Sequence, residues 1–190
     1  HTAMVPVSLL FGNKLVMETV NGDFTGPFVD NVIAEISETL PMDKNEIMAY
    51  AEEVMDRFRN PFIKHALADI ALNSISKFKV RVLPSLLGYY KTTKKLPTSL
   101  TFSLACLIQF YKGTWNNEAL PVKDTPELVE ACKKAWELEN VESVVAAVLA
   151  NTDFWDEDLN KVDGLAQALV HALKEIEANG IQQGFLNFRK

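Results

Sequence analysis

Hydrophobic and polar residues follow one another along this chain with the period of an α-helix. Six apolar residues in segment 28–40 share one helical face, and six more in segment 47–58 share another. Pro27 suits the first turn of the earlier helix, where the N–H that proline lacks is not needed. Asp43 and Glu46 have the spacing of a capping box, which predicts the start of the later helix.

Three more helices are predicted in the middle of the chain. One runs from residue 62 to about residue 72. The next runs from about residue 78 to 90, and Pro84 should kink or split it because proline removes a backbone hydrogen bond. Residues 98–111 are almost wholly apolar. These 14 residues are too few to cross a bilayer, so we expect a central helix that is buried on every side.

The last third of the chain continues the helical pattern after a loop over residues 114–124. Thr125-Pro126-Glu127 is typical of a helix start, Asn140 begins a further short helix, and a last long helix is expected over residues 159–180. No segment shows the alternation of a strand between hairpin turns. We therefore expect an all-α protein with seven to nine helices, forming a single multi-helical domain over residues 1–190.

Composition narrows the class of protein. With 48% hydrophobic and 23% charged residues, the chain has ordinary globular usage, which excludes a disordered, collagen-like or purely coiled-coil protein. Its two cysteines, Cys106 and Cys132, are too few for a disulfide framework and too far apart for a metal knuckle. Neither a secretory signal nor a membrane span is visible. These features predict a reduced, cytoplasmic protein without a membrane partner.

Several common cofactor-binding, catalytic and metal-binding motifs do not occur in this chain. Its eight glycines form neither G-x-G-x-x-G nor a P-loop, so a dinucleotide is not bound here by that route. Neither H-E-x-x-H nor G-x-S-x-G occurs, and the three histidines, at 1, 65 and 171, do not have the spacing of metal ligands. We therefore predict no metal site, and His171 is expected to be structural.

Positive charge is concentrated in one part of the chain. Residues 57–95 hold nine basic residues and one acid, Asp69, and so carry +8, whereas the whole chain carries −6. Such a field raises the local concentration of anions. Lys91, Lys94 and Lys95 follow a helix end and are interpreted as a solvated face. The overall negative charge disfavours a nucleic-acid partner.

A polar run interrupts the apolar pattern inside this basic segment. Asn73 and Lys77 lie in the sequence Asn-Ser-Ile-Ser-Lys between two apolar stretches, where a pocket wall with donors for hydroxyl or carboxylate oxygens is expected. Lys64 and His65, placed on the preceding helix, are candidates to face the same anion as Lys77. An exposed surface histidine is an equally good interpretation of His65.

The start of the chain is unusual for a native amino terminus. His1 is followed at once by core-like apolar residues over segment 3–11 with no helix cap ahead of them. Chain termini are more often polar and loose. We therefore expect this chain to come from the middle of a larger protein, and a tag remnant is the alternative interpretation of its first residues.

Several segments, in order, resemble the carboxy-terminal domain of the mannitol dehydrogenase family. The segments that carry the resemblance are His1-Thr2-Ala3, Arg57-Phe58-Arg59-Asn60-Pro61-Phe62-Ile63, Asn73-Ser74-Ile75-Ser76-Lys77-Phe78 and Val82-Leu83-Pro84. The resemblance continues through residue 113 and becomes general helical character afterwards. It implies a helical substrate-binding domain joined to an amino-terminal dinucleotide-binding domain that binds most of the NAD cofactor.

The resemblance also implies roles for individual residues. The family's catalytic motif is Lys, four residues, Asn, two residues, His, and His1 resembles that last histidine. Lys77 matches the family lysine that contacts the far end of the substrate, and Asn73, Lys64 and His65 are its candidate neighbours. The polyol-specific members carry an arginine eight residues before that lysine, whereas this chain has Asp69. That difference disfavours mannitol as the substrate.

The implied reaction is reduction of a keto-hexuronate, tagaturonate to altronate, with a small anionic sugar acid as the partner. Fructuronate reduction to mannonate and a mannitol-type polyol oxidation stay open within the family. A non-catalytic helical module that binds an anion or a protein is a third hypothesis. If the enzyme hypothesis holds, His1 should lie at an edge near Lys77, with apolar surface exposed where the other domain would cover it.

Overall fold

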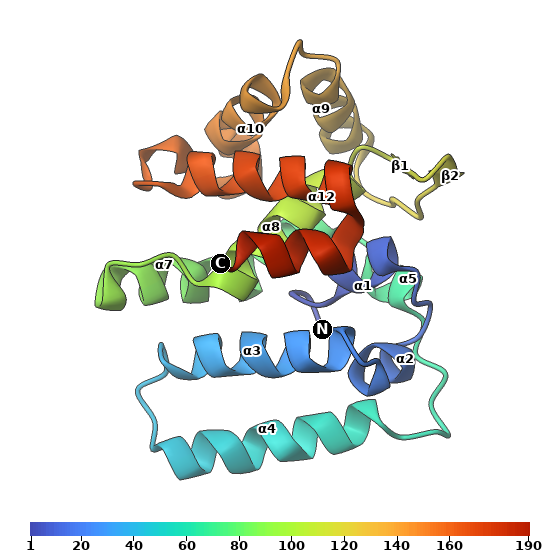
Figure 1. The fold of residues 1–190 in the computed structure, drawn as a ribbon, viewed down its shortest axis with the longest axis vertical. Helices are drawn as coiled ribbons and strands as arrows, with labels where there is room; N and C mark the ends of the chain where they lie inside the picture. The colour runs from blue at the N-terminus through green and yellow to red at the C-terminus, as the bar shows by residue number, and fades with distance from the viewer.

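The computed structural model describes all 190 residues and is almost entirely helical, which confirms the predicted all-α class (Figure 1). Its helices are α1 (Val5–Phe11), α2 (Val16–Asn21), α3 (Thr25–Ser37), α4 (Lys44–Phe58), α5 (Leu67–Ile70), α6 (Ser74–Arg81), α7 (Leu83–Thr93), α8 (Thr98–Phe110), α9 (Pro126–Trp136), α10 (Val141–Ala150), α11 (Thr152–Trp155) and α12 (Leu165–Phe188). A 3-10 turn spans Leu159–Lys161, and a hairpin joins β1 (Thr114–Trp115) to β2 (Glu118–Ala119). No helix is both long and apolar enough to cross a membrane.

The twelve α-helices exceed the seven to nine predicted. The difference lies in short helices, since α1, α2, α5 and α11 have only four to seven residues each. A helix of one or two turns does not repeat an apolar face often enough for periodicity to reveal it. The helices of eight residues or more fall within the predicted range.

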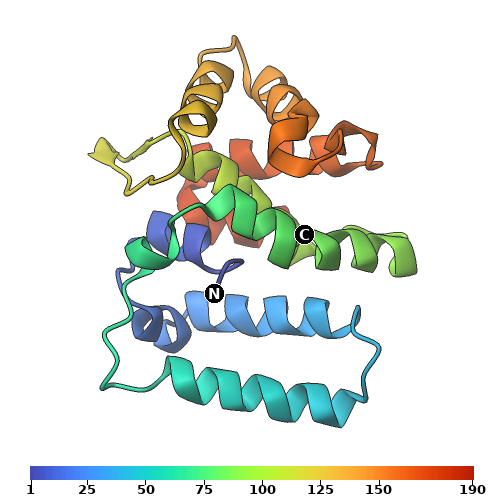
Figure 2. The same ribbon diagram turned by 180° about the vertical axis from the view of Figure 1, so that it is seen from behind.

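The helices are stacked in layers around a central helix (Figures 1 and 2). The α3–α4 pair forms one end of the molecule, α8 and α12 cross its middle, and α9 with α10 forms the other end. Every residue of α8 from Ser99 to Phe110 is buried, as predicted for residues 98–111. Because α8 has no polar face, it is stable only where α1, α3 and α12 cover it.

The predicted helix over residues 62–72 is wrong for its first half. Only Leu67–Ile70 is helical, and the chain before it is extended. The Val16 N–H donates to the His65 carbonyl (3.0 Å), and the Leu67 N–H donates to the Lys14 carbonyl (2.9 Å). Pairing with this distant segment satisfies backbone groups that a helix would otherwise have paired locally. Lys64 and His65 therefore lie on an extended segment rather than on a helix.

Of two other predicted helix boundaries, one is confirmed and one is wrong. The predicted break at Pro84 is confirmed, because α6 ends at Arg81 and α7 begins at Leu83. The predicted end at Gly180 is instead a bend inside α12, which continues to Phe188. Gly180 has φ 77° and ψ −174°, a conformation that essentially only glycine adopts. The last helix also begins later than expected, at Leu165.

The expected loop over residues 114–124 contains a two-residue hairpin. Asn116 and Asn117 connect its strands with positive φ angles of 50° and 64°, which asparagine tolerates better than most residues. Thr114 pairs with Ala119 across the hairpin. The strands are too short to show alternation, so no strand was predicted here.

Candidate functional site

His1 lies where three separate parts of the chain meet. Its ring packs against that of Phe58 at the end of α4, with 4.1 Å between centroids. The ring of His65 approaches it edge-on at 5.0 Å. These side chains line an open cavity of about 480 Å³, which we call the His1 cleft. Its lining residues are His1, Val16, Tyr50, Val54, Arg57, Phe58, Ile63 and His65.

The backbone of His1 is held firmly although its side chain is exposed. The N–H groups of Met4 and Val5 each donate to the His1 carbonyl at 3.1 Å, so His1 accepts the first hydrogen bonds leading into α1. The Ser103 hydroxyl donates to the Ala3 carbonyl at 2.5 Å and ties this turn to the central helix. The packing of α1 on α8 therefore fixes where His1 lies.

Lys77 and Arg81 lie one helical turn apart on the same face of α6. Neither residue lines the His1 cleft. The helix therefore carries two cations close together outside the lining of the cleft.

Lys77 is half-buried and has one fixed partner. Its ammonium group donates to the Ile70 carbonyl at 2.9 Å, which holds the side chain back against α5. An ammonium group has three N–H donors, so this bond leaves two for another acceptor. Lys77 can both brace α5 against α6 and hold an anion.

A buried polar network holds the start of α6. The Ile75 N–H donates to the Tyr111 hydroxyl at 3.2 Å, and that hydroxyl donates to Asp124 at 2.5 Å. Burial, together with this hydrogen bond, raises the pKa of Tyr111 well above its ordinary value, so the hydroxyl keeps its proton. Tyr111 therefore caps the helix that carries Lys77 and Arg81.

The predicted polar run is only partly a break. Asn73 does interrupt the chain, with a left-handed φ of 52°, but the four residues after it already belong to α6. The Ser74 hydroxyl is buried and donates to the Ala71 carbonyl at 2.7 Å. The run thus serves to begin α6 rather than to present a row of free donors.

The structure brings together some of the candidate residues and separates others. His1 and His65 share the cleft, whereas Lys64, Asn73 and Lys77 do not line it. Lys64 and Asn73 are both exposed. The predicted solvated face is confirmed, since Lys91, Lys94 and Lys95 are all exposed.

The interpretation of His171 as structural stays a prediction. His171 is exposed on α12, 3.9 Å from a Glu175 carboxylate oxygen, with its ring 5.5 Å from that of Phe188.

Both cysteines are buried and unpaired. Burial raises the pKa of the Cys132 thiol to about 12, and it also raises that of Cys106, so neither thiol is a ready nucleophile.

An arginine and a tyrosine at the site were not singled out from the sequence. Arg57 and Tyr50 line the cleft from α4. The concentration of basic residues in segment 57–95 was a signal for Arg57. It could not select this residue, because its position beside His1 depends on how α4 packs against the start of the chain.

Comparison with known proteins identifies the fold and the relatives of this chain. The model of the mannitol dehydrogenase C-terminal domain matches residues 1–177. The chain belongs to the mannitol dehydrogenase family. The resemblance found in the sequence is thereby confirmed, and members of this family are oxidoreductases.

Two kinds of relative in the mannitol dehydrogenase family are informative. Altronate oxidoreductases of Escherichia coli O7:K1 and of Escherichia coli strain K12 are each 39% identical over 189 residues, which cover 96% of this chain and 39% of the relative. Mannitol 2-dehydrogenase of Pseudomonas fluorescens, solved in a ternary complex with NAD and D-mannitol, superposes with a TM-score of 0.86 at 18% identity. That match covers 100% of this chain and 38% of the other, and at such low identity it shows the shared fold.

Proposed function

We propose that this chain is the substrate-binding domain of an NAD-dependent oxidoreductase that reduces the keto-hexuronate tagaturonate to altronate in the cytoplasm. The observation that carries the proposal is the His1 cleft, where a family histidine adjoins Arg57, Phe58 and His65. The altronate oxidoreductases that match 96% of the chain support the choice of substrate. The chain spans about two fifths of the length of these relatives, so the activity proposed is that of a longer protein.

His1 is suited to bind a substrate oxygen. Contact with Phe58 and His65 restricts its ring on two sides, so less rotational freedom is lost when a ring nitrogen forms a hydrogen bond. His1 is exposed, so a substrate can reach it. In the proposed reaction His1 orients the oxygen of the substrate carbonyl, and the family lysine, which lies outside this chain, supplies the proton.

The two basic residues of α6, Lys77 and Arg81, are assigned to the carboxylate of the uronate. A hexuronate carries a carboxylate at the end opposite its reacting carbonyl, and a charge-assisted hydrogen bond to such a group is shorter and stronger than a neutral one. Lys77 has two free N–H donors for it, and Arg81 adds a second positive charge on the same helix face. The ion pairs within the chain do not neutralise either residue.

The NAD cofactor supplies the hydride, and its binding is assigned mainly to a separate amino-terminal dinucleotide-binding domain. This chain contains none of the glycine-rich turns that hold a pyrophosphate. Large apolar side chains beside the His1 cleft are exposed, Phe62 most of all at 93%, together with Ile63 and Tyr50. We assign this apolar edge to contact with the missing domain, which would close the cleft and exclude water.

The test is steady-state oxidation of NADH by the full-length protein with tagaturonate, fructuronate and fructose as alternative substrates. The highest kcat/KM is expected with tagaturonate, because altronate oxidoreductases match 96% of the chain and because its carboxylate can pair with a basic residue. A preference for fructuronate or for the neutral ketose would overturn the proposed substrate. The 190-residue chain alone is expected to be inactive, and turnover by the pure chain would contradict the need for a second domain.

A further inference from the structure

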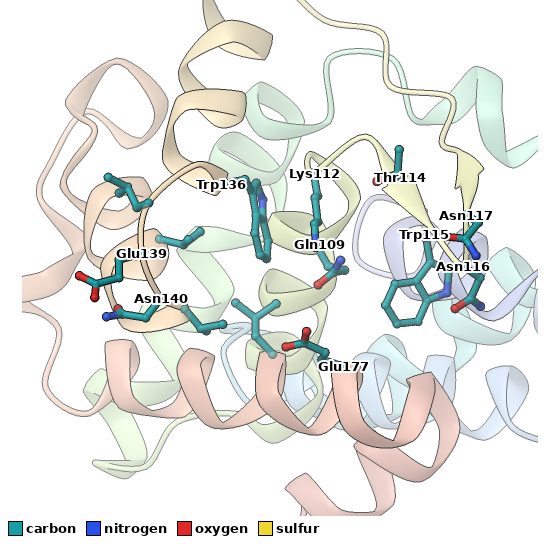
Figure 3. A pocket seen from close by; sticks show the side chains of 14 residues that line it. Gln109, Lys112, Thr114, Trp115, Asn116, Asn117, Trp136, Glu139, Asn140 and Glu177 are labelled. Carbon is teal, nitrogen blue, oxygen red and sulfur yellow. The ribbon is translucent and has the colours of Figure 1, made fainter.

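A second and larger cavity lies away from the His1 cleft. It has a volume of about 720 Å³ and is bounded by the end of α8, the β1–β2 hairpin, the α9–α10 connection and α12 (Figure 3). No residue lines both cavities. Its volume is within the usual range for small-molecule sites. We call it the aromatic cleft, after Trp115 and Trp136.

A nearly buried amide points into the aromatic cleft without a partner. Gln109, near the end of α8, is only 5% exposed, lines the cleft, and forms no side-chain hydrogen bond within the chain. Its carboxamide offers two donors and an acceptor. Thr101 alone has a fully enclosed polar side-chain atom without a partner, so solvent in the cleft reaches the carboxamide of Gln109, and a ligand that enters the cleft can replace that solvent.

Two indoles flank this amide. In Figure 3 the side chain of Gln109 lies between those of Trp136 and Trp115. Trp136 is fixed by its indole N–H, which donates to the Ile108 carbonyl at 3.1 Å, and by Lys112, whose ammonium lies 5.0 Å from the ring centroid. Aromatic faces of this kind pack against the C–H face of a sugar ring while polar groups at the edge bind its hydroxyls.

The charges at the cleft differ from those around His1. Lys112 contributes one positive charge, whereas Glu139 and Glu177 contribute two negative charges, and none of the three forms an ion pair within the chain. A carboxylate or phosphate gains little here, because the local charge is not positive. Glu177 can accept hydrogen bonds from hydroxyl groups, and Lys112 can donate them.

We propose that the aromatic cleft is a binding site for a neutral carbohydrate, in which a pyranose ring packs beside the indoles and hydrogen-bonds to Gln109 and Glu177. The site is separate from the His1 cleft and binds the sugar without transforming it. The proposal does not depend on the reductase activity, because none of its residues belongs to that cleft.

The test measures binding of methyl β-D-glucopyranoside, which has neither a ketone nor a carboxylate, to the full-length protein without NADH. Saturation-transfer NMR gives the dissociation constant, and fluorine NMR of 5-fluorotryptophan-labelled protein reports the indoles. We expect the signals of Trp115 and Trp136 to move. The signal of Trp155 should not, because this residue is buried and its indole N–H donates to the Val148 carbonyl.

Variants separate the proposed contacts from general effects. Gln109→Leu removes two hydrogen bonds with little change in volume and should weaken binding about tenfold, and Glu177→Gln should weaken it about threefold. The matched control is Glu130→Gln, an exposed acid on α9 outside the cleft, which should leave binding unchanged. If Gln109→Leu does not fold, Glu177→Gln and Trp115→Phe, both at accessible positions, carry the test.

Three results would overturn the proposal. The first is unchanged affinity in both Gln109→Leu and Glu177→Gln. The second is no saturation transfer to the pyranoside in a protein that still melts cooperatively. The third is stronger binding of a tetramethylammonium salt than of the sugar, which would make the cleft a cation site. Because the assay contains no cofactor and no reducible substrate, these results are independent of whether tagaturonate is reduced.

Discussion

The two clefts of this molecule are built in different ways. The His1 cleft is formed by the start of the chain, the last turns of α4 and the extended segment before α5, and Arg57 is the one Lys, Arg, Asp or Glu residue that lines it. The aromatic cleft is formed by α8, α12 and a short hairpin, and its charges nearly cancel. One site is suited to select by charge, and the other by shape and hydrogen bonding. A single helical scaffold thus supports two recognition surfaces of different chemistry.

Both clefts depend on the same central helix. Near its middle, α8 holds the backbone of the chain start through Ser103 and the Ala3 carbonyl. Near its end, it presents Gln109 to the aromatic cleft. Substitutions at either cleft should therefore change one kind of binding, whereas a substitution that loosens α8 should change both.

The largest effect is expected for His1→Ala, which should impair reduction of the substrate without changing sugar binding in the aromatic cleft. In the full-length protein His1→Ala should lower kcat/KM for tagaturonate on the order of a hundredfold or more, because the group that orients the reacting oxygen is lost. Affinity for methyl β-D-glucopyranoside should not change. Parallel kinetics on His171→Ala, which removes an exposed histidine of α12, provide the control. Wild-type kinetics for His1→Ala would remove His1 from the site.

Lys77→Ala tests the charge selectivity of the His1 cleft. Loss of a charge-assisted hydrogen bond of about 1.5–3 kcal/mol should lower kcat/KM for tagaturonate roughly ten- to a hundredfold, and much less for a neutral ketose. NADH affinity should hardly change. The melting temperature should fall slightly, because the bond to the Ile70 carbonyl is lost too.

The test of Lys77→Ala has a matched control and a result that would contradict it. Lys91→Ala removes an exposed lysine of the same basic segment and should change neither substrate's kinetics. An equal fractional loss for the uronate and the neutral ketose would show that Lys77 braces α5 and α6 without binding the carboxylate.

Gly180→Ala should lower the unfolding free energy, because it strains the bend in α12, a helix that lines the aromatic cleft. The φ of 77° and ψ of −174° at Gly180 disfavour any side chain, so alanine should cost about 1–3 kcal/mol of unfolding free energy. Chemical denaturation measures this. Gly88→Ala is the matched control, since Gly88 lies inside α7 with ordinary space around it, and alanine should leave stability unchanged or raise it. A neutral Gly180→Ala would show that the bend in α12 is not fixed.

The smallest effect tests the scaffold that the clefts share. Glu35 caps α8, since its carboxylate accepts from the N–H groups of Ser99 (2.7 Å) and Leu100 (2.9 Å). Burial nevertheless raises the pKa of Glu35 above its ordinary value of 4.5. The folded protein thus holds this proton to higher pH than the unfolded chain does. The stability that this proton contributes is complete below pH 4.5 and is lost as pH rises through the raised pKa.

Denaturant titrations at a series of pH values check this dependence. Relative to Glu35→Gln, which does not titrate, wild-type stability should fall as the pH rises above 4.5. Asp30→Asn lies on the exposed face of α3, the helix that carries Glu35, and should keep the wild-type pH dependence of stability. A parallel pH profile for wild type and Glu35→Gln would show that the carboxyl does not titrate differently on folding.

Much of the fold could be predicted because the signals are local. The apolar run of residues 98–111 specifies a helix buried on every side, and Pro84 specifies a break between α6 and α7. Asp43 accepts from the Asn45 N–H at 2.8 Å and begins α4 where the sequence placed it. These features depend on residues within a few positions of each other, so one short segment contains the information.

The remainder was decided by contacts between distant parts of the chain. Segment 62–66 has a helix-like pattern, yet it is extended because its backbone pairs with residues 14–16. The ring of His1 contacts Phe58 and His65 only because α1 and α4 pack around the same corner. Local pattern sets which segments can be helical, but the geometry of a site is set by which helix ends are buried together, and that depends on the packing free energy of the whole chain.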